Sequence, residues 1–133
     1  MTKLLPYYLI LLFLSGCIDR HDRTSSVYGH INDENGDPVD SILVTLHAFN
    51  ISKERLLDAV YTDENGNYEM ITDVPKGFSS LSVSSPFWPL KNPKFMMFYQ
   101  GFSFIYKNDQ QTNNCCNARV GERTKYDFKL MPR

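Results

Sequence analysis

The chain has 133 residues, with 14 basic and 15 acidic side chains and a formal net charge of −1. This length is typical of one domain, and the balanced charge leaves no basic surplus of the kind that a nucleic-acid partner requires. Strand-forming residues are frequent beyond the first 17 positions, and no long stretch has helical spacing. We therefore expect an all-β fold without nucleic-acid binding.

The first 16 residues have the pattern of a secretory signal peptide. Lys3 precedes an apolar run from Leu4 to Leu14, and the small residues Ser15 and Gly16 follow it. A bilayer-spanning helix needs about 20 apolar residues, roughly twice the length of this run. The pattern favours a cleaved signal over an uncleaved membrane anchor.

The segment Leu14-Ser15-Gly16-Cys17 resembles the lipobox of bacterial lipoproteins. In that family the cysteine becomes the mature N-terminus and carries the lipid. The resemblance implies that residues 1–16 are removed and that Cys17 is the lipid attachment site, acylated with chains such as palmitate. It also implies a membrane-anchored protein in the cell envelope, in the outer membrane of a Gram-negative bacterium. Two or more acyl chains hold a protein stably at a bilayer, whereas one binds only marginally.

Residues 17–26 are polar and charged and are predicted to form a lipidated tether. The nine residues after Cys17 reach at most about 30 Å when fully extended. The folded domain, predicted at 27–133, is therefore expected to stay close to the bilayer.

From Val27 onward the chain is predicted as short strands separated by turns. Asp-Glu-Asn-Gly occurs at 33–36 and again at 63–66. Asn-Gly favours hairpin turns because both residues accept positive φ. The predicted strands are, in chain order, 27–32, 42–49, 56–62, 68–72, 78–84 and 126–130.

An up-and-down strand order would place both Asn-Gly turns at one end of a sandwich and the tether at the other. The loops nearest the bilayer would then carry Lys53, Arg55 and Lys76. We expect the turn acids to be solvated rather than calcium ligands, because the glycine is fourth in each run and no bidentate glutamate follows. We predict no metal site and no cofactor.

Four segments together carry a family resemblance. They are G-x-I-x-D-x-N-G-x-P-V at 29–39, V-x-L at 44–46, T-D-x-N-G-x-Y at 62–68 and V-P-x-G at 74–77. This pattern looks like the carboxypeptidase regulatory-like domain, a seven-stranded, transthyretin-like (prealbumin-like) β-sandwich. The resemblance implies a noncatalytic binding or scaffolding module with a protein partner in the envelope.

Residues 86–124 depart from the family pattern. The nearly apolar stretch 95–106 is predicted either as one long strand or as a hairpin turning near Gln100-Gly101. Aromatic side chains in a sandwich mostly belong to the core. An alternative function is capture of a glycan or another ligand, for which the candidate platform is Phe87, Trp88, Tyr99 and Tyr106.

Cys115 and Cys116 are a candidate redox or modification site. Three uses remain open: a local disulfide, bridges to another chain, or a soft-metal pair, although two sulfurs alone do not complete a zinc site. The chain is also similar, more weakly, to small lipoproteins encoded beside a radical S-adenosylmethionine enzyme. That resemblance implies a second alternative, in which this protein is the substrate or partner of such an enzyme.

Catalysis has little support in the sequence. A nucleophilic relay needs a base beside the nucleophile, and the chain has only His21, His30 and His47, of which the first lies in the tether. Glycine-rich phosphate loops and metal-binding helix motifs are missing. We therefore expect no enzymatic activity and assign no catalytic residue.

Overall fold

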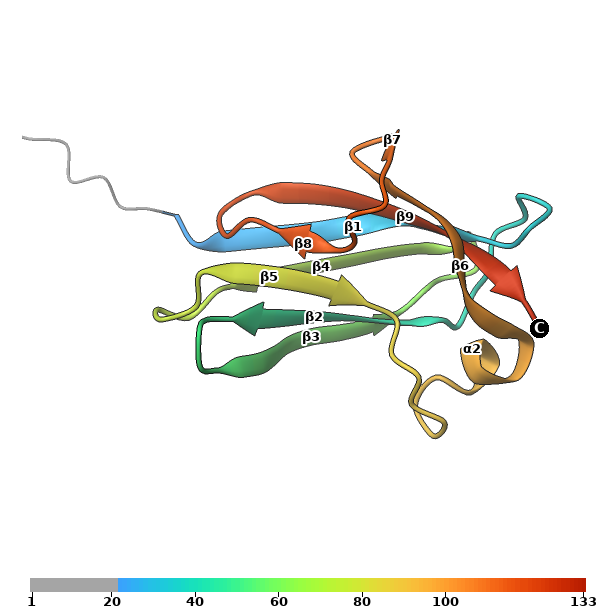
Figure 1. Ribbon diagram of the computed structural model, residues 1–133, viewed down its shortest axis with the longest axis horizontal. Helices are drawn as coiled ribbons and strands as arrows, with labels where there is room; N and C mark the ends of the chain where they lie inside the picture. The colour runs from blue at the N-terminus through green and yellow to red at the C-terminus, as the bar shows by residue number, and fades with distance from the viewer. Residues whose placement is uncertain (1–21) are drawn as a thin grey trace, which may run out of the picture.

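The computed structural model describes residues 22–133, so the predicted signal peptide, Cys17 and most of the tether lie outside the described residues. Two sheets pack face to face as a sandwich (Figure 1). Its strands are β1 (Thr24–Asn32), β2 (Leu43–Phe49), β3 (Glu54–Tyr61), β4 (Asn67–Asp73), β5 (Ser80–Ser84), β6 (Tyr99–Lys107), β7 (Gln110–Gln111), β8 (Asn117–Ala118) and β9 (Arg123–Pro132). A short helix, α2 (Pro93–Phe98), precedes β6.

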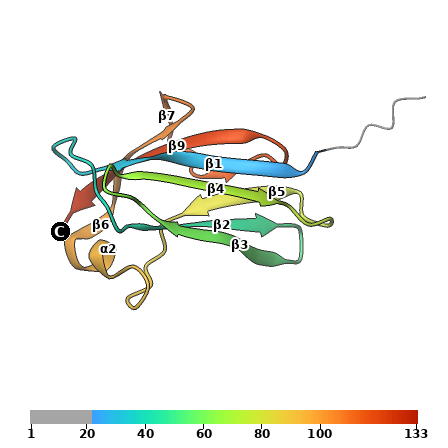
Figure 2. The same cartoon turned by 180° about the vertical axis from the view of Figure 1, so that it is seen from behind.

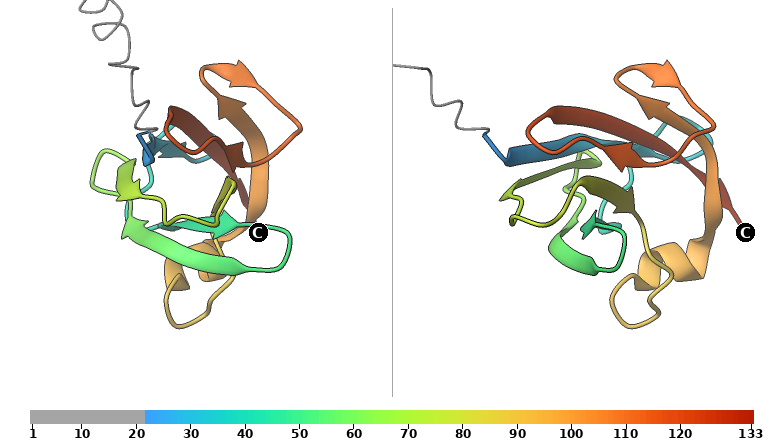
Figure 3. Two further views of the ribbon diagram at one scale, coloured as in Figure 1. Left: turned by 90° about the vertical axis from the view of Figure 1, so that its left-hand side faces the viewer. Right: turned by 60° about the vertical axis from the view of Figure 1, so that its left-hand side comes forward.

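The predicted β-sandwich is confirmed, but the predicted count of seven strands is wrong. One sheet has five strands in the order β4-β1-β9-β6-β7, and the other has four in the order β3-β2-β5-β8. Figure 3 shows the two sheets as separate layers. β7 and β8 are two residues long, too short for an alternating pattern to reveal them.

The apolar stretch 95–106 is neither the long strand nor the hairpin that its composition suggested. It begins inside α2 and continues as β6. Pro93 stands at the start of the helix, where its fixed φ and missing N–H are tolerated. Phe95 is fully buried, whereas Met97 and Phe98 are exposed, so the short helix places one aromatic ring in the core and two apolar side chains outside.

The core lies between the sheets and comes from alternate residues of the long strands. Predicted alternation in 27–32 and 126–130 is confirmed, whereas residues 42–46 are buried on both faces, Thr45 included. The largest fully buried side chains are Tyr126, Phe95, Phe128, Ile31, Ile42, Leu46, Met70, Leu81 and Leu130.

The first strand starts three residues earlier than predicted. Thr24, Ser25 and Ser26 pair with β4 instead of belonging to the tether. The Arg23 guanidinium donates to the carbonyl oxygens of Val74, Pro75 and Phe78. This start carries no hydrophobic alternation because its side chains are polar, and they bond to distant parts of the chain: Thr24 to Asp73 and Ser25 to Gly121.

β1 and β9, the first and last strands, pair in parallel. The chain therefore enters the sandwich at one end and its C-terminus lies at the opposite end (Figure 2). β1 also pairs with β4 in antiparallel fashion, so it occupies an interior position in the five-stranded sheet.

Gly29 allows β1 and β9 to lie this close. Their pairing skips Gly29 and His30, and side chains replace the missing contacts there. The Tyr68 hydroxyl donates to the carbonyl oxygen of Tyr126 at 2.6 Å, and Asp127 Oδ1 accepts the His30 backbone N–H at 2.8 Å. A Cβ atom on residue 29 would lie 1.7 Å from the Tyr126 carbonyl oxygen. Burial raises the pKa of Tyr68, which keeps its hydroxyl protonated as a donor.

The two Asn-Gly turns have the same internal bonding. Asp33 Oδ1 accepts the backbone N–H groups of Asn35 and Asp37, and Asp63 makes the equivalent bonds in the second turn. Gly36 and Gly66 both have positive φ. The Asp33 and Asp63 carboxylates thus serve as hydrogen-bond acceptors within their own turns.

Both turns lie at the same end of the sandwich, as predicted. The Gly66 carbonyl oxygen accepts the backbone N–H of Ile31 at 2.8 Å, which holds the second turn beside the end of β1. The up-and-down order behind that prediction is wrong, because each turn leads from one sheet to the other instead of closing a hairpin. The correct placement follows from the antiparallel pairing of β1 with β4.

Candidate functional site

The two ends of the sandwich carry different side chains. We call the end at which the described residues begin, at Asp22, the N-terminal end; it includes loops 50–53, 74–79 and 119–122. Its exposed basic side chains are Lys53, Arg55, Lys76, Arg119 and Arg123, and its exposed acids are Asp22, Glu54, Asp73 and Glu122. The opposite, far end includes both Asn-Gly turns, the segment 85–92, α2 and the C-terminus. Its acids are Asp33, Glu34, Asp37, Asp40, Asp63 and Glu64.

Large apolar side chains are exposed at the far end on two segments that pack against each other, the loop 86–91 and α2. We define the distal apolar surface as Phe87, Trp88, Leu90, Met97 and Phe98. Leu90 is 97% exposed and Met97 is 67% exposed, although both are strongly hydrophobic. Groups of exposed apolar side chains on a small domain are characteristic of interaction sites.

Asn92 holds the loop of the distal apolar surface to both neighbouring strands. Its side chain is fully buried. Its Oδ1 accepts the backbone N–H of Leu43 at 2.9 Å, and its Nδ2 donates to Ser85 Oγ at 3.0 Å and to the Pro86 carbonyl oxygen at 2.9 Å. One amide thereby joins the start of β2, the end of β5 and the start of the loop. Sequence analysis missed this residue, because an isolated asparagine ahead of a proline is an ordinary turn signal.

Aromatic rings continue from the distal apolar surface into the core. The Phe87 ring lies 5.0 Å from the Phe95 ring in an edge-to-face contact. Phe95 lies 5.8 Å from Phe102, which lies 4.7 Å from Phe128 of β9. The exposed surface is therefore backed by packed rings, and such pairs favour a fixed geometry over a mobile loop.

An ion pair attaches α2 to the connection between β1 and β2. Lys94 Nζ lies 2.7 Å from Asp40 Oδ1, and the hydrogen bond from this ammonium group lowers the Asp40 pKa to about 2. Asp40 therefore stays ionised at every pH near neutrality and keeps its attraction for α2. Both side chains are partly exposed, so the pair positions the helix with little effect on stability.

The four aromatics of the predicted ligand platform lie in different parts of the structure. Phe87 and Trp88 are exposed at the far end, and Tyr99 is half-buried near Phe95. Tyr106 stands seven residues further along β6, which corresponds to about 23 Å of strand. The nearly uninterrupted apolar sequence of 95–106 gives no indication of this separation.

Tyr106 instead borders a polar hollow of about 460 Å³ on the outer face of the five-stranded sheet. Lys125 in this hollow lies 2.6 Å from Asp109, whose hydrogen bond raises the Lys125 pKa. His30 Nδ1 lies 3.0 Å from Asn67 Oδ1. Within residues 22–133, the side-chain partner of the His30 imidazole is thus the Asn67 amide. An amide does not polarise the ring as the carboxylate partner of a general base does.

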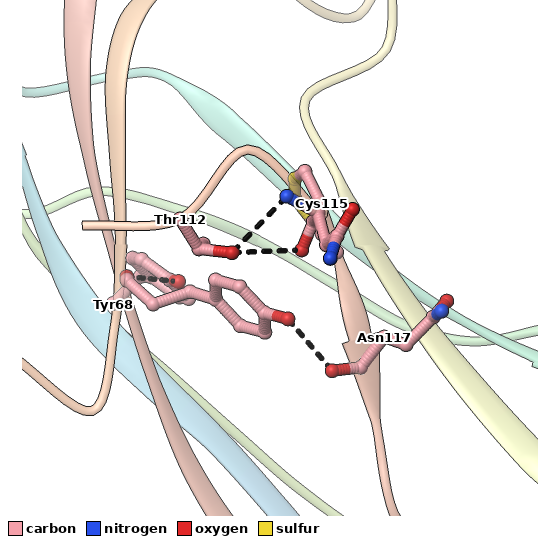
Figure 4. The surroundings of a disulfide bond; sticks show 7 residues. Tyr68, Thr112, Cys115 and Asn117 are labelled. Carbon is pink, nitrogen blue, oxygen red and sulfur yellow. Dashed lines mark hydrogen bonds between the residues drawn. A yellow bond between two sulfur atoms is a disulfide. The ribbon is translucent and has the colours of Figure 1, made fainter. Parts of the chain in front are cut away.

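Cys115 and Cys116 form a disulfide with each other, and the peptide bond between them is cis. They lie in the segment that leads from β7 in one sheet to β8 in the other. Cys115 is exposed, whereas Cys116 is buried and its carbonyl oxygen accepts the Val83 N–H at 2.9 Å. The Tyr126 hydroxyl donates to the next carbonyl oxygen, that of Asn117 (Figure 4). The pair therefore lies at a connection between the sheets.

Within residues 22–133, no three His, Cys, Asp or Glu side chains are grouped as metal ligands. Among these same residues, no helix has both the length and the hydrophobicity needed to cross a bilayer.

No protein-family model matches the chain, and no curated protein matches it. Among solved structures, it is similar to a pilus-presented adhesin, with 12% sequence identity and a TM-score of 0.41. That match covers 86% of this chain and 29% of the adhesin chain. The resemblance to the carboxypeptidase regulatory-like domain therefore depends on the sequence motifs alone.

Two further solved structures are similar at comparable levels. One is a 9R-lipoxygenase from Cyanothece PCC8801, with 13% identity, a TM-score of 0.38 and coverage of 84% of this chain and 17% of that chain. The other is the dioxygenase domain of a dioxygenase carbohydrate-binding protein fusion from the cellulolytic bacterium Streptomyces sp. SirexAA-E, with 13% identity, a TM-score of 0.39 and coverage of 81% and 79%. Likenesses at these TM-scores carry no argument about binding or activity.

Replacing Asn92 tests whether this side chain holds the distal loop. Asn92→Leu leaves the buried Leu43 N–H without its acceptor, which is expected to lower the free energy of unfolding by about 2 kcal/mol. Trp88 is the only tryptophan in the chain, so its emission reports on the same loop and is expected to shift to longer wavelength. The exposed Asn113→Leu variant is the control. An Asn92→Leu protein with native urea midpoint and emission would contradict this role.

Proposed function

We propose that this protein is a lipid-anchored, noncatalytic binding module of the cell envelope that holds a protein partner at its distal apolar surface. The observation that carries the proposal is the position of that surface. Its most exposed side chains, Leu90 and Met97, lie at the end opposite the chain start. An anchor at the chain start would thus leave this surface directed away from the bilayer.

The anchor is assigned to Cys17, from the lipobox resemblance. Asp22, the first described residue, is five positions later, so the two lie at most about 18 Å apart. Arg23 is already bonded to the loop after β4. A lipid on Cys17 would therefore restrict both the distance of the domain from the membrane and the end that faces it.

Several features favour a protein partner over a small ligand. The distal apolar surface is a projecting loop and helix, whereas small-molecule sites are concave. It combines aromatic residues and a methionine, which are enriched in protein interfaces. Acids of the two Asn-Gly turns lie at the same end, where they can form the polar rim that such interfaces have.

Acylation of Cys17 is tested by metabolic labelling. Native protein is expected to incorporate labelled palmitate and to fractionate with membranes, because thioether-linked lipid is its anchor. Cys17→Ser is expected to lose both properties. The chain has three cysteines, so the Cys115→Ser, Cys116→Ser variant is a matched control that keeps the label. Unlabelled native protein, or a Cys17→Ser variant that stays membrane-bound, would contradict the anchor.

Partner binding is tested by crosslinking in intact cells. The Leu90→Ser, Met97→Ser variant removes the two most exposed apolar side chains of the distal apolar surface without touching the core. It is expected to lose the specific crosslinked product at least about tenfold, a typical effect of losing interface anchors.

The matched control for that experiment is Leu56→Ser, Ile71→Ser, which removes two exposed apolar side chains elsewhere on the sandwich. It is expected to keep the crosslinked product. Equal loss in both variants, or equal retention in both, would show that the distal apolar surface is not the binding site.

A further inference from the structure

We infer that the N-terminal end of the sandwich binds anionic phospholipid headgroups through a basic surface. This surface consists of Lys53, Arg55, Lys76 and Arg119, all of them exposed. The inference deepens the proposed function, because an anchor on Cys17 would bring this end to the membrane. It adds a second, noncovalent attachment that would orient the domain.

The loops that carry the basic surface are fixed to one another. Asn50 Nδ2 donates to the Gly77 carbonyl oxygen at 2.7 Å, which joins the loops that hold Lys53 and Lys76. These loops border a hollow of about 530 Å³, whose charged lining consists of Lys53, Arg55, Lys76 and Glu54. Three cations and one carboxylate thus line a space large enough to receive a phosphate group.

The loop with Arg119 is held at the same end by the start of β1. The Gly121 N–H donates to Ser25 Oγ at 2.7 Å, and the Ser26 N–H donates to the Glu122 carbonyl oxygen at 3.0 Å. All four cations are therefore arranged around the point where the chain leaves toward Cys17. Hydrogen bonds between these loops, and between them and the start of β1, thus hold this end together.

Among the described residues, the four cations form no ion pair with a carboxylate. Four acids, Asp22, Glu54, Asp73 and Glu122, share this end, and the first three have other contacts. Asp22 accepts the Thr24 N–H, Asp73 accepts the Thr24 hydroxyl, and Glu54 lies 3.0 Å from His47 Nδ1. The cations remain available for an external anion.

The charge distribution and the short connection to Cys17 favour a membrane lipid as the source of that anion. The whole chain has a net charge of −1, so attraction to an anionic surface must come from a local excess of cations. Screening limits such attraction to about 10 Å at moderate salt, so the surface must be held near the bilayer. The short connection to Cys17 supplies that proximity, and the fully exposed Ile51 beside Lys53 adds an apolar contact for the interface.

The test uses the unacylated chain from Ile18 to Arg133, because both sheets and the core lie within residues 22–133. Cosedimentation is measured with phosphatidylcholine vesicles that contain or lack phosphatidylglycerol. We expect binding only to the vesicles with phosphatidylglycerol, weakening as salt rises. The variant with Lys53, Arg55, Lys76 and Arg119 all changed to Gln is expected to bind at least about tenfold less.

The control changes Lys91, Lys107, Lys129 and Arg133 to Gln, which alters the net charge equally but leaves the N-terminal end intact. It is expected to lose much less binding. Equal binding losses in the two variants, equal binding to both kinds of vesicle, or no binding would overturn the inference. Displacement by an equal concentration of inorganic phosphate would assign the surface to free phosphate and also overturn it. Because this chain carries no lipid, the result is independent of whether Cys17 is acylated.

Discussion

The parallel pairing of β1 with β9 is the constraint from which the polarity of the molecule follows. It places the chain start at one end of the sandwich and the C-terminus at the other. The close approach of the two strands depends on Gly29, and the Tyr68 hydroxyl and the Asp127 carboxylate satisfy the backbone groups that the interrupted ladder leaves open. With the proposed anchor on Cys17, strand pairing would thus decide which surfaces face a membrane and which face away.

Two kinds of structure are built on this frame, and each suits a different contact. At the N-terminal end, short loops tied by hydrogen bonds between side chains and the backbone display cations near Asp22. At the far end, Asn92 and the ring of Phe95 support a projecting loop and helix with apolar side chains exposed. The two proposed contacts, polar attraction to headgroups and apolar contact with a protein, would therefore be made at opposite ends of the sandwich.

Local pattern predicted much of the fold. Alternation revealed the strand at 126–130, and Asn-Gly revealed both turns, because each signal lies within a few residues. The roles of residues whose partners are distant in sequence were not predicted. Arg23 bonds to carbonyl oxygens about fifty positions away, and Asn92 bonds to Leu43. The placement of the four platform aromatics could not be predicted for the same reason, because Phe87 and Trp88 lie in the loop before α2 and Tyr106 stands seven residues beyond Tyr99 along β6.

The most direct test of this polarity is resonance energy transfer from tryptophan to a dansyl-labelled lipid headgroup, with the acylated protein in vesicles. Trp88 reports on the far end, and a Trp88→Phe, Phe78→Trp variant reports on the N-terminal end, where Phe78 borders the basic hollow. We expect strong transfer in the variant and weak transfer in the native protein. Equal transfer, or stronger transfer from Trp88, would contradict an orientation with the N-terminal end at the membrane.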